Sequence, residues 1–181
     1  IVNRLVIFEQ LARAFADVFH ADLELVYEIS HNLAQLEPHP EYGDVWMHRK
    51  GATRAFPAGH PLLEGTRWAA TGHPVLIPGS NRDRSFVLRP AEGAVRSLYS
   101  VNHGAGRRMS RTAALRDLDR KSVEDDYRAA GILVNDDGRV PIDEAGPAYK
   151  PTRDVVDAVV GAGLATVEYE LRPLASLKGG G

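Results

Sequence analysis

The chain of 181 residues contains no cysteine, which excludes disulfide bonds and thiolate metal ligands within these residues. It has no run of 18 apolar residues, so the sequence predicts no transmembrane helix and no membrane partner. A formal net charge of -2 gives no global signature of nucleic-acid binding, so contacts with RNA would have to come from local basic clusters. Lack of cysteine does not fix the compartment, and the cytoplasm is the default expectation.

Several chemical motifs are also missing. No G-x-x-x-x-G-K-[ST] sequence is present, which excludes a P-loop nucleotide site, and no Ser–His–Asp order or paired-carboxylate spacing stands out. No internal repeat or low-complexity linker divides the chain. Its start, Ile-Val-Asn-Arg, resembles neither a methionine start nor a signal peptide and is typical of a point inside a longer protein. The length and the 44% apolar content predict one ordinary domain with a core.

Apolar periodicity predicts an α+β fold. Apolar residues spaced by three and four predict helices at residues 3–19, 110–130 and 155–160. Alternating or short apolar runs predict strands at residues 23–29, 45–48, 74–77, 85–88 and 167–171. Residues 33–43 contain prolines and a glycine and predict a loop. Because these strands and helices follow no regular βαβ rhythm, α+β is favoured over doubly wound α/β.

The most informative segment is Tyr99-Ser-Val-Asn-His-Gly-Ala-Gly-Arg-Arg-Met-Ser-Arg111. Gly104 and Gly106 would let backbone N–H groups approach a phosphate closely, and a helix starting just after them would add its positive end. His103 would then be placed to attack phosphorus or to bind a metal ion. Taken alone, the segment favours the alternative of a glycine turn beside an ordinary histidine.

Three further segments carry polar groups in suitable places. His31-Asn32 follows a predicted strand and is typical of a metal ligand or of a hydrogen-bonded loop residue. The segment 48–54 sets three cations, a glycine and a hydroxyl within seven residues, which suits phosphate oxygens or a solvated basic turn. The segment 78–85 is a polar loop for a ribose, phosphate or base, or a simple hairpin turn.

In order and spacing, these segments resemble the RtcB family of RNA-splicing ligases over essentially the whole chain. The matching stretches are Ile29-Ser-His-Asn32, His48-Arg-Lys-Gly-Ala-Thr-Arg-Ala-Phe56, Val75-Leu-Ile-Pro-Gly-Ser80, Ser85-Phe-Val87, Asn102-His-Gly-Ala-Gly-Arg-Arg-Met-Ser-Arg111, Asp143-Glu-Ala145, Ala148-Tyr-Lys150 and Lys178-Gly179. Each motif alone is moderately specific, but several in the right order leave little room for chance.

The resemblance implies a GTP- and Mn²⁺-dependent RNA ligase of tRNA splicing or RNA repair. Such an enzyme joins an RNA 3′-phosphate or 2′,3′-cyclic phosphate end to a 5′-hydroxyl end. The family's nucleophile falls on His103, which would form a histidine–GMP intermediate, and a family manganese ligand falls on His31. The implied guanylate contacts are Asn32, Pro78, Gly79, Ser80, Asn81, Ser85, Gly104, Ala105, Gly106, Tyr149 and Lys178. Charge and position suggest four contacts to RNA phosphates: Arg49, Lys50, Arg54 and Arg107.

The chain departs from the family pattern in two ways. The family's other metal ligands are an aspartate, a cysteine, a histidine in an Asn-His-Phe-Ile-Glu type motif and a further histidine, and none is present. Residues 1–181 are therefore expected to be the C-terminal part of an RtcB-type ligase domain, with the N-terminal half of the same protein as a partner. Residues 81–84 replace a Met-Gly and small-residue pattern beside the nucleotide. The alternative is a non-catalytic relative that binds a nucleotide or RNA ends, or an inactive fragment.

Overall fold

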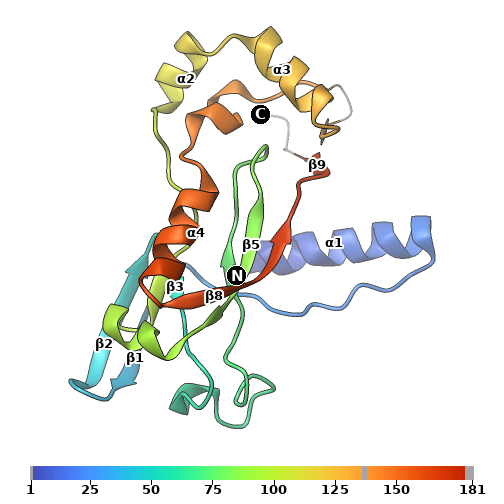
Figure 1. Cartoon of the computed structure of the whole chain (residues 1–181). Helices are drawn as coiled ribbons and strands as arrows, with labels where there is room; N and C mark the ends of the chain where they lie inside the picture. The colour runs from blue at the N-terminus through green and yellow to red at the C-terminus, as the bar shows by residue number, and fades with distance from the viewer. Residues whose placement is uncertain (1, 136–137, 178–181) are drawn as a thin grey trace. The chain divides into compact units, whose positions relative to one another are not determined.

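The computed structural model describes residues 2–135 and 138–177. The chain divides into two units, residues 1–30 and residues 31–181, which are considered separately below (Figure 1). Among the described residues, no helix combines the length and the apolar character needed to cross a membrane. Helices and small, mainly antiparallel sheets make up the structure, which confirms the predicted α+β class.

The N-terminal unit consists of one helix and an extended segment. Helix α1 (Val2–Phe19) confirms the helix predicted from periodicity, although none of its residues is buried. The strand predicted at residues 23–29 is wrong, because residues 21–30 form no strand. A strand needs a hydrogen-bonding partner, and the described residues of this unit contain no other strand. Within the unit, Arg4 pairs with Glu28.

The second unit opens with a β-hairpin, of which the sequence predicted only the second strand, at residues 45–48. Strands β1 (Asn32–His39) and β2 (Gly43–Lys50) pair in antiparallel register, so the prediction of a loop at residues 33–43 is wrong. Pro38 fits because β1 pairs on one side only, where the missing N–H of an edge proline is tolerated. Gly43 enters β2 with a φ of 68°, the left-handed conformation that suits glycine in a tight turn.

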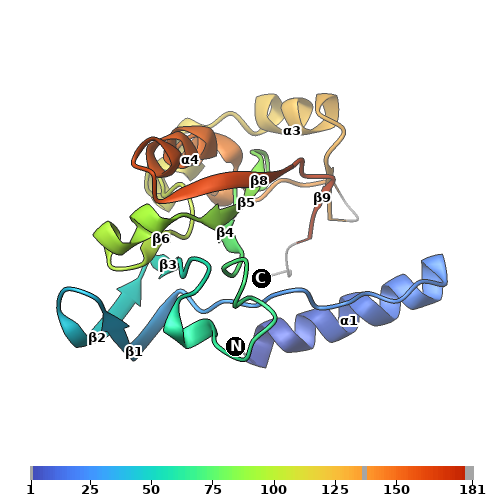
Figure 2. The same ribbon diagram turned by 60° about the horizontal axis from the view of Figure 1, so that its bottom comes forward.

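A three-stranded antiparallel sheet forms the centre of this unit. Its order is β4 (Val75–Ile77), β5 (Ser85–Pro90) and β8 (Ala165–Leu171), and all three strands were predicted. Helix α4 (Thr152–Gly161), also predicted, packs against the sheet in both views (Figures 1 and 2). The buried core between them comprises Val75, Ile77, Phe86, Leu88, Val156, Val159 and Ala165.

A short antiparallel pair connects the hairpin to the segment that contains His103. Strand β3 (Ala52–Arg54) pairs with β6 (Ser100–Asn102), so that Ala52 lies opposite Asn102. Two 3₁₀ helices, η1 (Pro61–Leu63) and η2 (Glu92–Ser97), lie in the connections between strands. This pairing places residue 51, in the middle of the basic segment 48–54, beside residue 103.

The C-terminal half of the second unit has its own core. Helices α2 (Arg111–Asp117) and α3 (Arg120–Ala129) fill the predicted helical region and are capped by the side chains of Ser110 and Asp119. Strand β7 (Leu133–Val134) pairs in parallel with β9 (Ala175–Ser176), and the 3₁₀ helices η3 (Ile142–Glu144) and η4 (Gly146–Ala148) follow β7. The buried side chains are Val123, Tyr127, Ile132, Val134, Val140, Ile142 and Ala145.

Candidate functional site

The structure brings His31 and His103 together, although 72 positions separate them. Their rings stack with centroids 4.6 Å apart and an interplanar angle of 27°. The β1–β2 register places Asn32 opposite Lys50, and the backbone N–H of His103 donates to the carbonyl of Gly51 at 3.4 Å. A Cβ atom on Gly51 would lie 3.8 Å from Nε2 of His103, so this glycine lies directly against the imidazole.

His31 stays the predicted metal ligand, and it has no set of further ligands around it within the described part of the chain. No group of three or more His, Asp or Glu side chains that could hold a metal ion occurs there. Manganese prefers several oxygen and nitrogen ligands, so the described residues do not make a complete manganese site.

The segment 78–85 lies against the histidine segment and is tightly closed. A Cβ atom on Gly104 would lie 3.6 Å from the carbonyl oxygen of Pro78. A Cβ atom on Gly79 would lie only 2.2 Å from the carbonyl oxygen of Arg84, so the loop requires glycine there. The Gly79 N–H donates to Oγ of Ser85 at 3.0 Å. The predicted nucleotide loop is therefore held by its own backbone and hydroxyl groups.

The predicted helix after the glycines is present, but its N-terminus is not next to Gly106. Gly106 adopts a φ of 76°, and the chain then runs alongside residues 148–150. Lys150 N–H donates to the carbonyl of Gly106 at 3.0 Å, Arg108 N–H donates to that of Ala148 at 2.9 Å, and Arg107 forms a β-bridge with Tyr149. Helix α2 begins only at Arg111. A phosphate at residues 104–106 would thus meet backbone N–H groups without an adjoining helix end.

A cavity of about 370 Å³ lies between segments 80–83 and 146–151. Ser80 and Tyr149 line it, and both were predicted as nucleotide contacts. Arg108 and Lys150 also line it, although no function was predicted for either. Arg108 directly follows Arg107 and Lys150 directly follows Tyr149, two residues predicted from the sequence, and this adjacency could have suggested them. The complete lining is Ser80, Arg82, Asp83, Arg108, Asp126, Gly146, Pro147, Tyr149, Lys150 and Pro151.

Arg107 holds Tyr149 in place instead of extending to solvent. Its guanidinium donates to the Tyr149 hydroxyl at 3.0 Å, to the Asp143 carbonyl at 2.5 Å and to the Met109 carbonyl at 3.0 Å. It also lies 4.8 Å from the centre of the Tyr149 ring, within cation–π range. These contacts use one N–H of each guanidinium nitrogen, and the role of Arg107 in binding RNA phosphate stays a prediction.

Arg49 is a structural residue, which corrects its prediction as an RNA contact. Its side chain is 4% exposed and pairs with the carboxylate of Glu37, which is 1% exposed, at 2.5 and 2.6 Å. It also donates to Oγ of Ser100 at 2.9 Å. Arg54 is half-buried and donates to the side chain of Gln35 at 3.1 Å. Lys50 is exposed and remains a predicted RNA contact.

The remaining predicted contacts flank these segments. Asn32 starts β1 beside His31, and Ala105 lies between the two glycines. Asn81 follows Ser80 and receives a hydrogen bond from the Tyr127 hydroxyl. Lys178 lies outside the described residues. The fold and site thus define an α+β protein with a stacked histidine pair, a glycine segment that follows it, and a cavity whose wall includes Arg108 at the end of that segment.

Comparison with known proteins identifies the family. The family model for the tRNA-splicing ligase RtcB matches residues 1–179, and the chain belongs to this family. It is 41% identical to a tRNA-splicing ligase RtcB of Thermococcus kodakarensis, over 98% of this chain and 39% of the relative. A tRNA-splicing ligase RtcB of Pyrococcus furiosus is 39% identical over 98% of this chain and 19% of its own length. An RNA-splicing ligase RtcB of Mycobacterium tuberculosis is 40% identical over 98% of this chain and 41% of its own length. The chain therefore spans about two-fifths or less of these relatives.

Proposed function

We propose that these residues form the nucleotide-binding part of a GTP-dependent RNA ligase for tRNA splicing or RNA repair. The ligase would join RNA 3′-phosphate or 2′,3′-cyclic phosphate ends to 5′-hydroxyl ends. The observation that carries the proposal is the path of residues 103–108. This segment begins at the stacked histidines, passes against the carbonyl of Pro78 and ends at Arg108 on the cavity wall. A nucleotide with its base in the cavity would direct its phosphates toward His103.

In this proposal His103 is the nucleophile. A neutral imidazole nitrogen attacks the α-phosphorus of GTP, a nitrogen–phosphorus bond forms, and pyrophosphate leaves. The guanylyl group then passes from His103 to the RNA 3′-phosphate, after hydrolysis of a cyclic phosphate where one is present. The RNA 5′-hydroxyl attacks the activated phosphate and GMP leaves. Backbone N–H groups of Gly104, Ala105 and Gly106 would stabilise charge on the phosphate oxygens.

The cavity suits the base and ribose. Its volume of about 370 Å³ falls within the ordinary range for small-molecule sites. Ser80 presents a hydroxyl, and Tyr149 presents a ring fixed from one side by Arg107 and through its hydroxyl by Glu144 at 3.2 Å. A ring held in this way loses little freedom on binding, which favours affinity. Lys50, exposed at the end of β2, would contact an RNA phosphate.

Manganese would act as a Lewis acid at the phosphates, and His31 is the candidate ligand in this chain. Because His31 by itself would not make a manganese site, we propose that further ligands complete it. That completion would agree with the predicted contribution of another part of the same protein. Among the described residues, His31 would contribute a neutral imidazole nitrogen beside the nucleophile.

The proposal is tested by RNA joining. The intact polypeptide that contains these residues is incubated with GTP, Mn²⁺, an RNA ending in a 3′-phosphate and an RNA starting with a 5′-hydroxyl. We expect a joined product that is lost in His103→Ala and retained in His20→Asn, a control histidine in the N-terminal unit. Joining that persists in His103→Ala would contradict the assigned nucleophile, and no joining by the unmodified polypeptide would favour a non-catalytic binding protein.

A further inference from the structure

Tyr127 of α3 connects the two walls of the cavity, although it belongs to none of the segments that resemble the family. Its side chain is 1% exposed. Its hydroxyl donates a hydrogen bond to Oδ1 of Asn81 and accepts one from the backbone N–H of Gly146 at 2.9 Å. Asn81 lies in the nucleotide loop of residues 78–85, and Gly146 opens the segment that ends at Tyr149. One hydroxyl therefore bridges both walls.

The two walls are also in direct contact. A Cβ atom added to Gly146 would lie 2.6 Å from Cβ of Arg82, so the loop packs closely against this glycine. The distance between the walls thus depends on small side chains and on the bridging hydroxyl. A change of a few tenths of an ångström there would alter the space available to a base.

All four residues that replace the family's Met-Gly pattern find partners inside the chain. Asn81 bonds to Tyr127, and Arg82 pairs with Asp126 at 2.6 Å. Asp83 accepts a hydrogen bond from the Thr152 N–H at 2.6 Å, and Arg84 pairs with Glu170 at 2.9 Å. These contacts attach the loop to α3, α4 and β8. The altered loop is therefore an anchored wall of the cavity.

Among these contacts, the one made by Tyr127 should matter most. The side chains of Arg82 and Asp126 are 38% and 49% exposed, and such surface ion pairs contribute little to stability. The Tyr127 hydroxyl is enclosed, and its loss would leave both Asn81 Oδ1 and the Gly146 N–H without their partner. Burial raises the pKa of Tyr127 to about 12, so the hydroxyl retains its proton at neutral pH.

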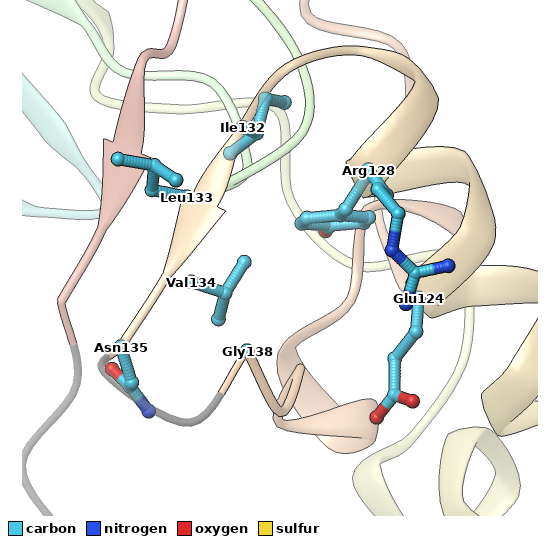
Figure 3. Close-up of a pocket in the computed structure, with 8 residues that line it drawn as sticks. Glu124, Arg128, Ile132, Leu133, Val134, Asn135 and Gly138 are labelled. Carbon is cyan, nitrogen blue, oxygen red and sulfur yellow. The ribbon is translucent and has the colours of Figure 1, made fainter.

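The ring of Tyr127 has a separate structural role. It lines a second cavity of about 250 Å³, together with Ile132 and Val134 on its apolar side and Glu124 and Arg128 at its rim (Figure 3). Truncation to alanine would enlarge this cavity and destabilise the core. Phenylalanine keeps the ring and removes only the hydroxyl, so it is the suitable replacement.

We propose that Tyr127 is a positioning residue: its hydroxyl sets the spacing of the cavity walls and thereby the affinity for guanine nucleotide. This inference rests on the proposed function, in which the cavity holds the base. Tyr127 acts through Asn81 and Gly146 without touching the nucleotide.

The test is a GTP titration of the intact polypeptide and its variants. Tyr127→Phe should weaken GTP binding about tenfold, since loss of a buried bridge corresponds to about 1.4 kcal/mol. Asn81→Ala should weaken it similarly, and the double variant should lose less than the sum of the two single losses, because both substitutions remove the same bridge. Asp125→Asn is the matched control on the same helix, because Asp125 pairs with Lys121 and Arg128 away from the loop. It should bind GTP like the unmodified protein.

Each outcome has a distinct meaning. Equal GTP affinity in Tyr127→Phe and the unmodified protein would overturn this inference and leave the proposed function intact. Additive losses in the double variant would show that Tyr127 acts independently of Asn81, which would also overturn it. If Tyr127→Phe does not fold, the GTP affinity of Asn81→Ala alone tests this inference. An affinity equal to that of the unmodified protein would then contradict it. No GTP binding by the unmodified protein would overturn both proposals.

Discussion

Replacement of Arg49 by methionine should destabilise the unit of residues 31–181 by about 3–5 kcal/mol, the cost of breaking a buried ion pair. The Glu37 carboxylate is 1% exposed, so without Arg49 it would remain buried and lack its counter-ion. Arg49 also donates to the carbonyls of Leu98 and Tyr99 at 3.1 and 3.3 Å. The loss is a large fraction of the 5–15 kcal/mol that typically stabilises a domain.

Urea unfolding measures this effect, with the midpoint expected to fall while the slope stays constant. The double variant Glu37→Leu/Arg49→Met should recover most of the loss, because an apolar pair leaves no buried charge. Arg89→Met is the control, since Arg89 pairs with Glu168 at the surface and its loss should cost less than about 1 kcal/mol. The reasoning would be refuted if Arg49→Met destabilised the protein no more than Arg89→Met.

Three further predictions concern pH, backbone and ligand selectivity. Burial lowers the pKa of His73 to about 4 in the folded protein, whereas the ordinary histidine pKa is 6.5. Between pH 6.5 and pH 4, the unfolded chain therefore binds more protons at His73 than the folded protein does. Stability should fall by about 3 kcal/mol as the pH drops through that window, and a flat urea midpoint there would contradict it. Gly79→Ala should abolish GTP binding, because the new Cβ would overlap the carbonyl oxygen of Arg84. Gly161→Ala is the control, because the space around Gly161 is open. Equal GTP affinities of the two variants would contradict this prediction. Arg107→Lys should weaken GTP binding and leave RNA binding unchanged, whereas Lys50→Ala should weaken RNA binding and leave GTP binding unchanged. Filter-binding measurements in which the two variants lose the same affinities for GTP and RNA would contradict this prediction.

Local patterns in the sequence predicted the central sheet and the helices. Strands β4, β5 and β8 and helix α4 have apolar spacing that is visible within a few residues. Strand β1 was missed because Pro38 and Pro40 suggest a loop, whereas pairing with β2, which was predicted at residues 45–48, satisfies the backbone of β1. At residues 23–29 the error is the opposite one: alternating apolar residues predicted a strand, but alternation alone cannot supply the partner strand that a sheet requires.

For the candidate site, the resemblance named residues that lie near one another, but their roles stay predictions and the use of their charges was not foreseen. The proximity of His31 and His103 and the placement of Ser80 and Tyr149 on one cavity agree with the predicted grouping. Arg49 looked like a phosphate contact because its partner, Glu37, lies across a hairpin that the sequence did not reveal. Tyr127 gave no signal, because its role depends on contacts with residues far away in the sequence.

The most direct test of the proposed chemistry is the intact mass of the polypeptide after incubation with GTP and Mn²⁺. We predict a mass gain equal to one GMP group that is absent in His103→Ala and retained in His20→Asn. A gain that persists without His103, or no gain in the unmodified polypeptide, would contradict the assignment of His103 as the guanylylated nucleophile.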